Sequence, residues 1–325
     1  MVATTHSGDT SVVSALTRFD FEGNIMDQNS FADYVFGKSK TVVQTDSGFE
    51  IAGHRWSLDD NRSRGLELVK VNKELNFLDQ SLIHYEINRT TNLPGILDID
   101  EGSKVVYGSF IRTGFSSGGG AYLGLLNQET DSILSEVIFR GPGGFAYGSY
   151  SISDVQETVD SNMLFIAEVD LPGAGPGNGK HFEIVKFNWE GEILGKIESL
   201  KEGDNQAIVQ DEQGDIYFYN SRVPFMLDTI DFGGSSNAGG ISKINSEMDS
   251  VLWSFKLNDF DMLTDERGHT ILGINQLTDG HLLAYGIAGY NSLTASERIG
   301  FICKFTKEGK CSGLANMAFL FLKSI

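Results

Sequence analysis

Short runs of alternating apolar and polar residues, separated by turn sequences, dominate the chain. Phe49 to Gly53 alternates in this way, and Leu66 to Val71 follows after a polar stretch. Thr41 to Thr45 precedes the first run, and Phe77 to Ile87 follows the second. A period of two is typical of strands with one buried face, because successive side chains point to opposite sides. Residues 41 to 87 therefore predict four strands joined by a tight turn, a longer loop and a second tight turn.

The tight turn between the first two strands of this unit recurs along the chain. Asp46-Ser47-Gly48 is followed by Asp100-Glu101-Gly102, by Asp211 to Gly214 and by Asp279-Gly280. Asp-Gly and related pairs favour hairpins because Gly accepts the positive φ that such turns need. The unit around residues 145 to 162 is the least regular, with Asp160-Ser161-Asn162 in place of a Gly turn.

A second signal marks the turn between the last two strands of each unit. It consists of an apolar residue, then Asn, Asp or Thr, then any residue, then Glu. The intervals between successive Glu residues are 52, 55, 61, 57 and 61, which predict an array of similar supersecondary units. The six copies end at Glu22, Glu74, Glu129, Glu190, Glu247 and Glu308.

Four strands repeated about six times predict an all-β fold, a β-propeller of about six four-stranded blades. A solenoid is the competing interpretation, but it would need fewer strands per unit and shorter periods. We expect a single propeller domain over residues 1–325. The approximate blades are 1–35, 36–90, 91–140, 141–203, 204–262 and 263–325.

The first blade is expected to lack its innermost strand. In complete units the inner turn precedes the marked Glu by about 26 to 33 residues, so counting back from Glu22 places that turn before Met1. Only 17 residues follow Glu308, and an outer strand near Leu314 to Leu322 is expected to use them. Truncation of the chain is one explanation for a missing strand.

Two hairpin sequences resemble those of secreted bacterial β-propeller repeat proteins. Residues 44–53 and 276–286 are similar to the inner hairpin of these repeats, and residues 243–254 and 301–309 to the outer hairpin. The resemblance covers nearly the whole chain and implies an extracellular or cell-surface setting. Assigned activities are few in that family, so the resemblance specifies fold rather than function. Residues 1–6 lack the basic start and apolar run of a signal peptide.

Charge narrows the possible partners. The chain carries 44 acidic and 25 basic side chains, a formal charge of −19, which repels phosphate backbones and anionic membrane surfaces. We therefore expect no nucleic-acid partner. We also expect no insertion into a membrane, since the late apolar run from Met317 to Leu322 is too short to span one.

The longer connections are predicted to gather on one face of the propeller, where binding residues usually lie. His54-Arg55-Trp56 begins one of these loops and combines a hydrogen-bonding group, a cation and an aromatic ring. Such a ring can stack on a sugar or another planar ligand while the two polar side chains form hydrogen bonds with it. Other polar residues in the loops of this face could also contact a ligand. The simpler interpretation is that they are ordinary surface residues. The candidate ligand-binding residues are His54, Arg55, Trp56, Arg112, His181, Arg222, His269 and Arg298.

Motifs for metal binding and catalysis are weak or missing. Asp259, Asp261, Asp265 and Glu266 form a weak calcium candidate, although their spacing does not match an EF-hand loop. The sequence contains no zinc spacing, phosphate-binding loop or nucleophile elbow. The six repeated Glu residues are expected around the rim, too far apart to act as a catalytic pair. We assign no catalytic residue and expect no cofactor.

The leading functional hypothesis is a non-enzymatic binding or interaction propeller, exported, that recognises a carbohydrate, a peptide or a protein on its long-loop face. The first alternative is a hydrolase or lyase that acts on a carbohydrate or a lactone at the ring centre. The second alternative is a structural fragment of a larger surface protein. An enzyme would bring carboxylates, His or Arg together in one pocket with shifted pKa values.

Overall fold

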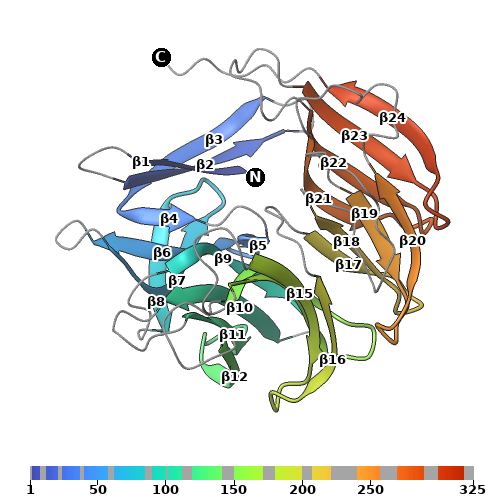
Figure 1. Ribbon diagram of the computed structural model, residues 1–325. Coiled ribbons are helices and arrows are strands. Elements are labelled where there is room, and N and C mark those ends of the chain that lie inside the picture. Colours follow the sequence, from blue (N-terminus) through green and yellow to red (C-terminus); the bar gives the residue numbers. More distant parts are fainter. Residues whose placement is uncertain are drawn as a thin grey trace. The chain divides into compact units, whose positions relative to one another are not determined.

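The computed structural model describes six antiparallel sheets, and the strands of each sheet are consecutive in the chain apart from a divided inner strand in the second (Figure 1). We call these sheets blades 1 to 6 in chain order. None of the described segments forms an apolar helix of bilayer-spanning length. The description covers residues 2–7, 12–20, 24–36, 40–57, 62–84, 90–99, 102–111, 119–140, 150–170, 180–199, 207–220, 240–256, 269–288 and 299–317.

The chain divides into two compact units, which we describe separately. The first unit comprises Met1–Ile152 and the short segments Val169–Pro176 and Trp189–Gly191. It contains blades 1 to 3. In blade 2 the inner strand is divided into β4 and β5, and both pieces pair with β6. Its strands are β1 (Val2–Ser7), β2 (Val12–Phe19), β3 (Ile25–Ala32), β4 (Tyr34–Phe36), β5 (Val42–Gln44), β6 (Gly48–Ser57), β7 (Arg62–Asn72), β8 (Phe77–His84), β9 (Thr90–Asp98), β10 (Ser103–Ile111), β11 (Gly119–Asn127) and β12 (Ile133–Arg140).

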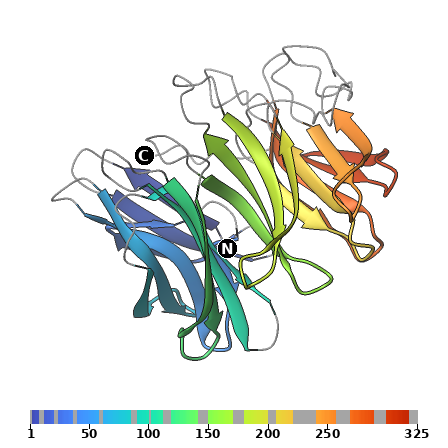
Figure 2. The same cartoon turned by 60° about the horizontal axis from the view of Figure 1, so that its bottom comes forward.

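The second unit contains most of blade 4 and the whole of the described parts of blades 5 and 6. Figure 2 shows the twist of the four strands of blade 4, drawn in green to yellow. The strands of these three blades are β13 (Tyr150–Glu157), β14 (Met163–Asp170), β15 (Lys180–Phe187), β16 (Ile193–Ser199), β17 (Ala207–Gln210), β18 (Ile216–Asn220), β19 (Gly240–Ile244), β20 (Val251–Lys256), β21 (His269–Gln276), β22 (Leu282–Ala288), β23 (Ile299–Phe305) and β24 (Cys311–Met317).

Blade 1 has three strands within the described residues, in the order β1-β2-β3. The turn that contains the repeated phrase joins β2 to β3, as it joins the third strand to the fourth in the other blades. Within the described residues, the strand that blade 1 lacks is therefore the innermost one, as predicted. The predicted β-propeller fold with about six blades is confirmed as well.

The repeated phrase forms the turn between the last two strands because its second residue caps that turn. The side-chain oxygen of Asn72 accepts hydrogen bonds from the backbone N–H groups of Glu74 and Asn76, at 3.1 and 2.8 Å. The Glu of the phrase is exposed in the five blades where it is described, and in blade 5 Asn245 donates a hydrogen bond of 2.9 Å to the carboxylate of Glu247. The same kind of backbone-to-side-chain bond recurs at Asp20, Asn127, Asn188, Asn245 and Thr306.

Each unit has apolar cores between consecutive blades. In the first unit one cluster lies between blades 1 and 2, with Leu16, Ile51 and Val69 fully buried, and another lies between blades 2 and 3. In the second unit comparable clusters join blade 4 to blade 5 and blade 5 to blade 6. Blades 2 and 5 thus bury apolar side chains on both faces, one face toward each neighbouring blade of the same unit.

Two glycines on inner strands lie under tyrosine rings of the neighbouring strand. Gly95 pairs with Tyr107 in blade 3, and Gly273 pairs with Tyr285 in blade 6. A Cβ atom at Gly95 would lie 2.1 Å from the Tyr107 ring, and one at Gly273 would lie 2.2 Å from the Tyr285 hydroxyl oxygen. Tyr107 is only 1% exposed, whereas Tyr285 is 37% exposed, so the first ring has far less room to move.

We expect the Gly95→Ala substitution to lower the free energy of unfolding by about 2 kcal/mol, because the buried Tyr107 ring must leave its packed position. The matched Gly273→Ala substitution should cost less than about 1 kcal/mol, because the exposed ring of Tyr285 can swing outward. Urea unfolding of the two variants measures the difference. Equal losses would contradict the account of these glycines.

Candidate functional site

A cavity of about 720 Å³ lies in the first unit, where the short turns of blades 2 and 3 meet. Its volume is within the range of small-molecule sites. Phe49, Val71 and Leu78 supply apolar surface, and charged and hydrogen-bonding side chains supply the remainder. The lining residues are Gln44, Thr45, Asp46, Ser47, Phe49, Glu50, Lys70, Val71, Leu78, Gly102, Gln128 and Glu129.

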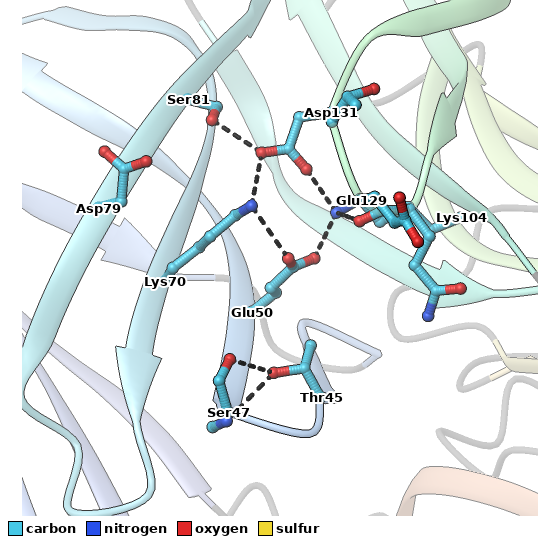
Figure 3. A network of polar contacts seen from close by, with 12 residues as sticks. Thr45, Ser47, Glu50, Lys70, Asp79, Ser81, Lys104, Glu129 and Asp131 are labelled. Atoms are coloured by element: carbon cyan, nitrogen blue, oxygen red, sulfur yellow. Dashed lines mark hydrogen bonds and ion pairs between the residues drawn. The ribbon is translucent and has the colours of Figure 1, made fainter.

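A buried network of two lysines and two carboxylates borders this cavity (Figure 3). The Nζ atom of Lys104 lies 2.5 Å from Oε2 of Glu50 and 2.6 Å from Oδ1 of Asp131. The Nζ atom of Lys70 lies 3.4 Å from Oε1 of Glu50 and 2.9 Å from Oδ2 of Asp131. Ser81 donates a further hydrogen bond of 2.9 Å to Asp131. Both lysines thus bridge the same two carboxylates.

The network neutralises charges that burial would otherwise make costly. The Lys104 side chain is 0% exposed, and Glu50 and Asp131 are nearly as buried. Desolvation alone would raise the pKa of Asp131, but hydrogen bonds from Lys104, Lys70 and Ser81 outweigh it and the net shift is downward. Asp131 therefore stays ionised and holds both lysines in place.

Glu50 also influences a second carboxyl group, that of Asp98 at the end of β9. Asp98 is exposed as a residue, but desolvation of its carboxyl raises its pKa and the negative charge of Glu50 raises it further. The positive charge of Lys104 opposes the shift without cancelling it. The result is an ion-paired carboxylate beside a carboxyl that keeps its proton to higher pH, a pairing typical of acid–base sites.

This site departs from a pattern that the other blades share. A cation directly precedes the apolar residue of the repeated phrase in five blades, at Arg18, Lys70, Lys186, Lys243 and Lys304. In blades 4, 5 and 6 it pairs with an Asp of the turn between the first two strands of its own blade. Blade 3 has Leu125 at this position, and Lys104 on the neighbouring strand supplies the charge instead.

Sequence reasoning missed Glu50, Asp98, Lys104 and Asp131. The signal that could have found them is the break in the repeat at Leu125. A missing cation at this position indicates that the charge in blade 3 comes from another residue. Asp131 adopts φ 56° in the turn of the repeated phrase, and Leu75 and Met248 do the same in blades 2 and 5, so its positive φ is not peculiar to blade 3.

The structure places the predicted residues His54 and Arg55 within a strand instead of a loop. β6 continues to Ser57, with Arg55 paired to Tyr34 of β4 and to Arg64 of β7. A shift of register between Gly53 and Arg55 accommodates His54 as an extra residue, so the strand bends and continues. Both residues lie toward the far end of β6 from Glu50 and do not line the cavity.

The surroundings of His54 and Arg55 contain shifted titratable groups. His54 is buried, and burial lowers its pKa from 6.5 to about 4. Burial raises the pKa of Glu67, although Arg55 and a hydrogen bond to Tyr34 oppose the shift. Burial also raises the pKa of Tyr34 to about 12, together with the charge of Glu67. The atom Oε2 of Glu67 is buried without a hydrogen-bond partner, so this group is a packed polar cluster rather than an open site.

The structure describes few of the other predicted site residues. Trp56, His181 and His269 lie on the strands β6, β15 and β21, and only their backbone is described. Within the described ranges no three His, Cys, Asp or Glu side chains form a group that could hold a metal ion. The residues that lie outside the description are Arg112, Arg222 and Arg298, and the calcium candidates Asp259, Asp261, Asp265 and Glu266.

Solved structures similar to this chain over most of its length share the propeller-like all-β fold. A protein of unknown function from Dyadobacter fermentans has TM-score 0.50 and 10% identity, over 87% of this chain and 96% of that one. A GH43 β-1,3-galactosidase with galactodeoxynojirimycin has TM-score 0.48 and 10% identity, with 91% and 96% covered. The GH43_1 enzyme from Xanthomonas citri complexed with xylose has TM-score 0.44 and 9% identity, with 86% and 90% covered. No protein-family model matches the chain, and a search of curated proteins found no match.

The comparisons correct the expectation of a non-enzymatic binding or interaction propeller. Two of the three named structures are GH43 enzymes rather than non-enzymatic binding proteins. The resemblance to secreted bacterial repeat proteins is confirmed only for the propeller-like fold. Sequence reasoning went wrong here because hairpin sequences specify a fold, and one fold serves many functions.

We expect the Lys104→Met substitution to destabilise the protein by about 3 to 5 kcal/mol, because it leaves Glu50 and Asp131 buried with one cation between them. The matched Lys186→Met substitution removes a cation from Asp160, whose side chain is 48% exposed, and should cost less than about 1 kcal/mol. Urea unfolding at pH 7 measures both. Similar losses for the two variants would show that the network between blades 2 and 3 contributes no more to the free energy of unfolding than an exposed ion pair does.

His54 should make stability depend on pH between about 4 and 6.5. The unfolded chain binds a proton at this residue below pH 6.5, whereas folded His54 resists protonation down to about pH 4. Stability should therefore fall as pH drops through this window, by up to about 3 kcal/mol relative to a His54→Gln variant. Unfolding curves recorded at several pH values test this. Parallel pH profiles for the two proteins would refute it.

Proposed function

We propose that this protein is a carbohydrate-acting hydrolase whose active site is the cavity between blades 2 and 3. The lining supports this substrate class. Phe49 and Leu78 offer apolar surface to the flat faces of a sugar ring, and Gln44, Ser47 and Gln128 offer hydrogen-bonding groups to its hydroxyls. The volume is sufficient for a short oligosaccharide.

The observation that carries the proposal is the pairing of Glu50 with Asp98. Hydrolysis of a glycosidic bond needs a proton donor for the leaving oxygen and a carboxylate that acts on the sugar carbon or on water. Asp98 is not one of the residues that line the cavity, but the charge of Glu50 acts on its carboxyl, and its raised pKa suits it to donate a proton. Glu50 is fixed by two lysines, lies on the cavity wall and is suited to act as the base.

In the proposed reaction Asp98 transfers its proton to the glycosidic oxygen as the bond from that oxygen to the anomeric carbon breaks. Glu50 removes a proton from the water that adds to the same carbon. One water is consumed, and the reaction calls for no cofactor. The lysines act as positioning residues, because they keep the Glu50 carboxylate in one orientation and offset its charge.

An extracellular or cell-surface setting stays a prediction, drawn from the resemblance to secreted repeat proteins. An exported hydrolase would meet polysaccharides there, so the setting and the proposed activity agree. Release of the protein into the medium of the native host, measured by immunoblot of the culture fractions, would test it.

The activity is tested with a panel of nitrophenyl glycosides and unlabelled oligosaccharides. We expect Asp98→Asn and Glu50→Gln each to lower kcat by about 100-fold or more, the usual loss when an acid or base is removed. Asp98→Asn should in addition remove the alkaline limb of the pH–rate profile, because that limb reports deprotonation of the acid. A purely structural role would not change the shape of that profile.

Asp79→Asn is the matched control, since Asp79 lies opposite Lys70 on β8, its carboxylate accepts a hydrogen bond from the backbone N–H of Gln80, and it has no part in the proposed reaction. It should retain near-normal kcat. Thermal unfolding of every variant separates loss of activity from loss of fold. Turnover that survives in folded Asp98→Asn and Glu50→Gln proteins would reject this cavity as the active site.

A further inference from the structure

The buried Lys104 side chain lies directly across the inner hairpin of blade 3 from Asp98. Lys104 on β10 and Asp98 on β9 are register partners. Side chains of such partners lie on the same face of a sheet, with Cβ atoms about 5 Å apart. The ion pairs of Lys104 nevertheless go to Glu50 and Asp131, and among the described ion pairs none joins it to Asp98.

A third hydrogen bond completes the surroundings of the Lys104 ammonium group. A protonated lysine has three N–H donors. Two of them bond to Glu50 and Asp131, and the third donates to the backbone carbonyl of Gln128 at 3.3 Å. The ammonium therefore acts on Asp98 only through space. Its charge lowers the pKa of Asp98 too little to cancel the combined effect of desolvation and Glu50.

A reciprocal pair of hydrogen bonds holds Gln128 against the turn between β9 and β10. The backbone N–H of Gln128 donates to the carbonyl of Gly102 at 2.9 Å, and the N–H of Gly102 donates to the side-chain Oε1 of Gln128 at 3.1 Å. We call this pair of bonds the Gln128 clamp. It ties the carbonyl that Lys104 uses to the hairpin that carries Lys104 and Asp98 on its two strands.

The clamp is not a general feature of the repeat. Gln128 occupies the variable third position of the repeated phrase, where blade 4 has Trp189 and blade 6 has Lys307. In blade 6 the side chain of Lys307 lies over the inner turn, where a Cβ atom at Gly280 would be 2.1 Å from it. Tryptophan and protonated lysine side chains cannot accept a hydrogen bond from a backbone N–H, whereas the Gln128 amide oxygen does.

We propose that Gln128 is a positioning residue of the proposed active site, and that its clamp on the inner turn of blade 3 keeps the Lys104 ammonium away from Asp98. This inference rests on the proposed function in taking Asp98 as the proton donor. Without the clamp the Gln128 carbonyl leaves Lys104, and the freed N–H turns to the carboxyl of its cross-strand partner. An ion pair favours the charged carboxylate, so Asp98 then loses its proton at lower pH.

Carbon-detected NMR of the side-chain carboxyl groups follows the titration of Asp98 without any turnover. Gln128→Met keeps the length of the side chain and removes the acceptor for the Gly102 N–H. We expect it to lower the pKa of Asp98 by about 1, an effect typical of a new cation beside a carboxyl group. Gln128→Glu keeps an acceptor and adds negative charge, so it should not lower that pKa. The matched control Ser246→Ala changes the same phrase position in blade 5 and should leave it unchanged.

The pH–rate profile measures the same change through turnover. Gln128→Met should move the alkaline limb to lower pH by the shift that NMR measures, whereas a purely structural role would lower the rate without moving the limb. Thermal unfolding confirms that each variant is folded. An Asp98 pKa that stays unchanged or rises in folded Gln128→Met, or that falls equally in Gln128→Glu, would overturn the inference.

The two proposals fail separately. A lowered Asp98 pKa in Gln128→Met, without hydrolysis of any glycoside by the wild-type protein, would support the positioning role and reject the hydrolase. Hydrolysis by the wild-type protein, with an alkaline limb that Gln128→Met does not move, would support the hydrolase and reject the positioning role.

Discussion

The burial of Lys104 is the constraint on which the account of this protein depends. A lysine with no exposed side-chain surface is tolerated only if opposite charges and hydrogen bonds surround it. Glu50 from blade 2 and Asp131 from blade 3 meet that requirement together, so the charge that must be neutralised also joins the two blades. Removal of any one member leaves the others buried and unbalanced. The cluster therefore fixes the position of Glu50 more firmly than an exposed carboxylate could be fixed.

The same constraint links the scaffold to the proposed chemistry. Lysine contacts hold Glu50 at the cavity wall, and the charge of Glu50 helps to raise the pKa of Asp98 nearby. One cluster thus yields a fixed carboxylate and a neighbouring proton donor, which together suit hydrolysis of a glycosidic bond.

Local patterns predicted the parts of the fold that depend on neighbouring residues. The turns that follow the repeated phrase could be read from sequence because Asn72 and its counterparts bond to backbone groups only a few residues away. The three strands of blade 1 followed from counting the same phrase. The Lys104 cluster could not be predicted, because Glu50 and Lys104 are 54 residues apart and meet only when two blades pack together. His54 was expected in a loop because the residues after it are polar. The strand in fact continues past a bulge at this position, which the sequence pattern does not reveal.

The central claim is that Glu50 and Asp98 form the active site of a carbohydrate hydrolase. Labelling with an epoxyalkyl glycoside tests it most directly, because the epoxide reacts with carboxyl groups that contact a bound sugar. After digestion, peptide mapping by mass spectrometry identifies the modified residue. The account predicts one label per chain, on Glu50 or Asp98, blocked by excess oligosaccharide. A label on another carboxyl group, or no label that a saccharide competes away, would contradict it.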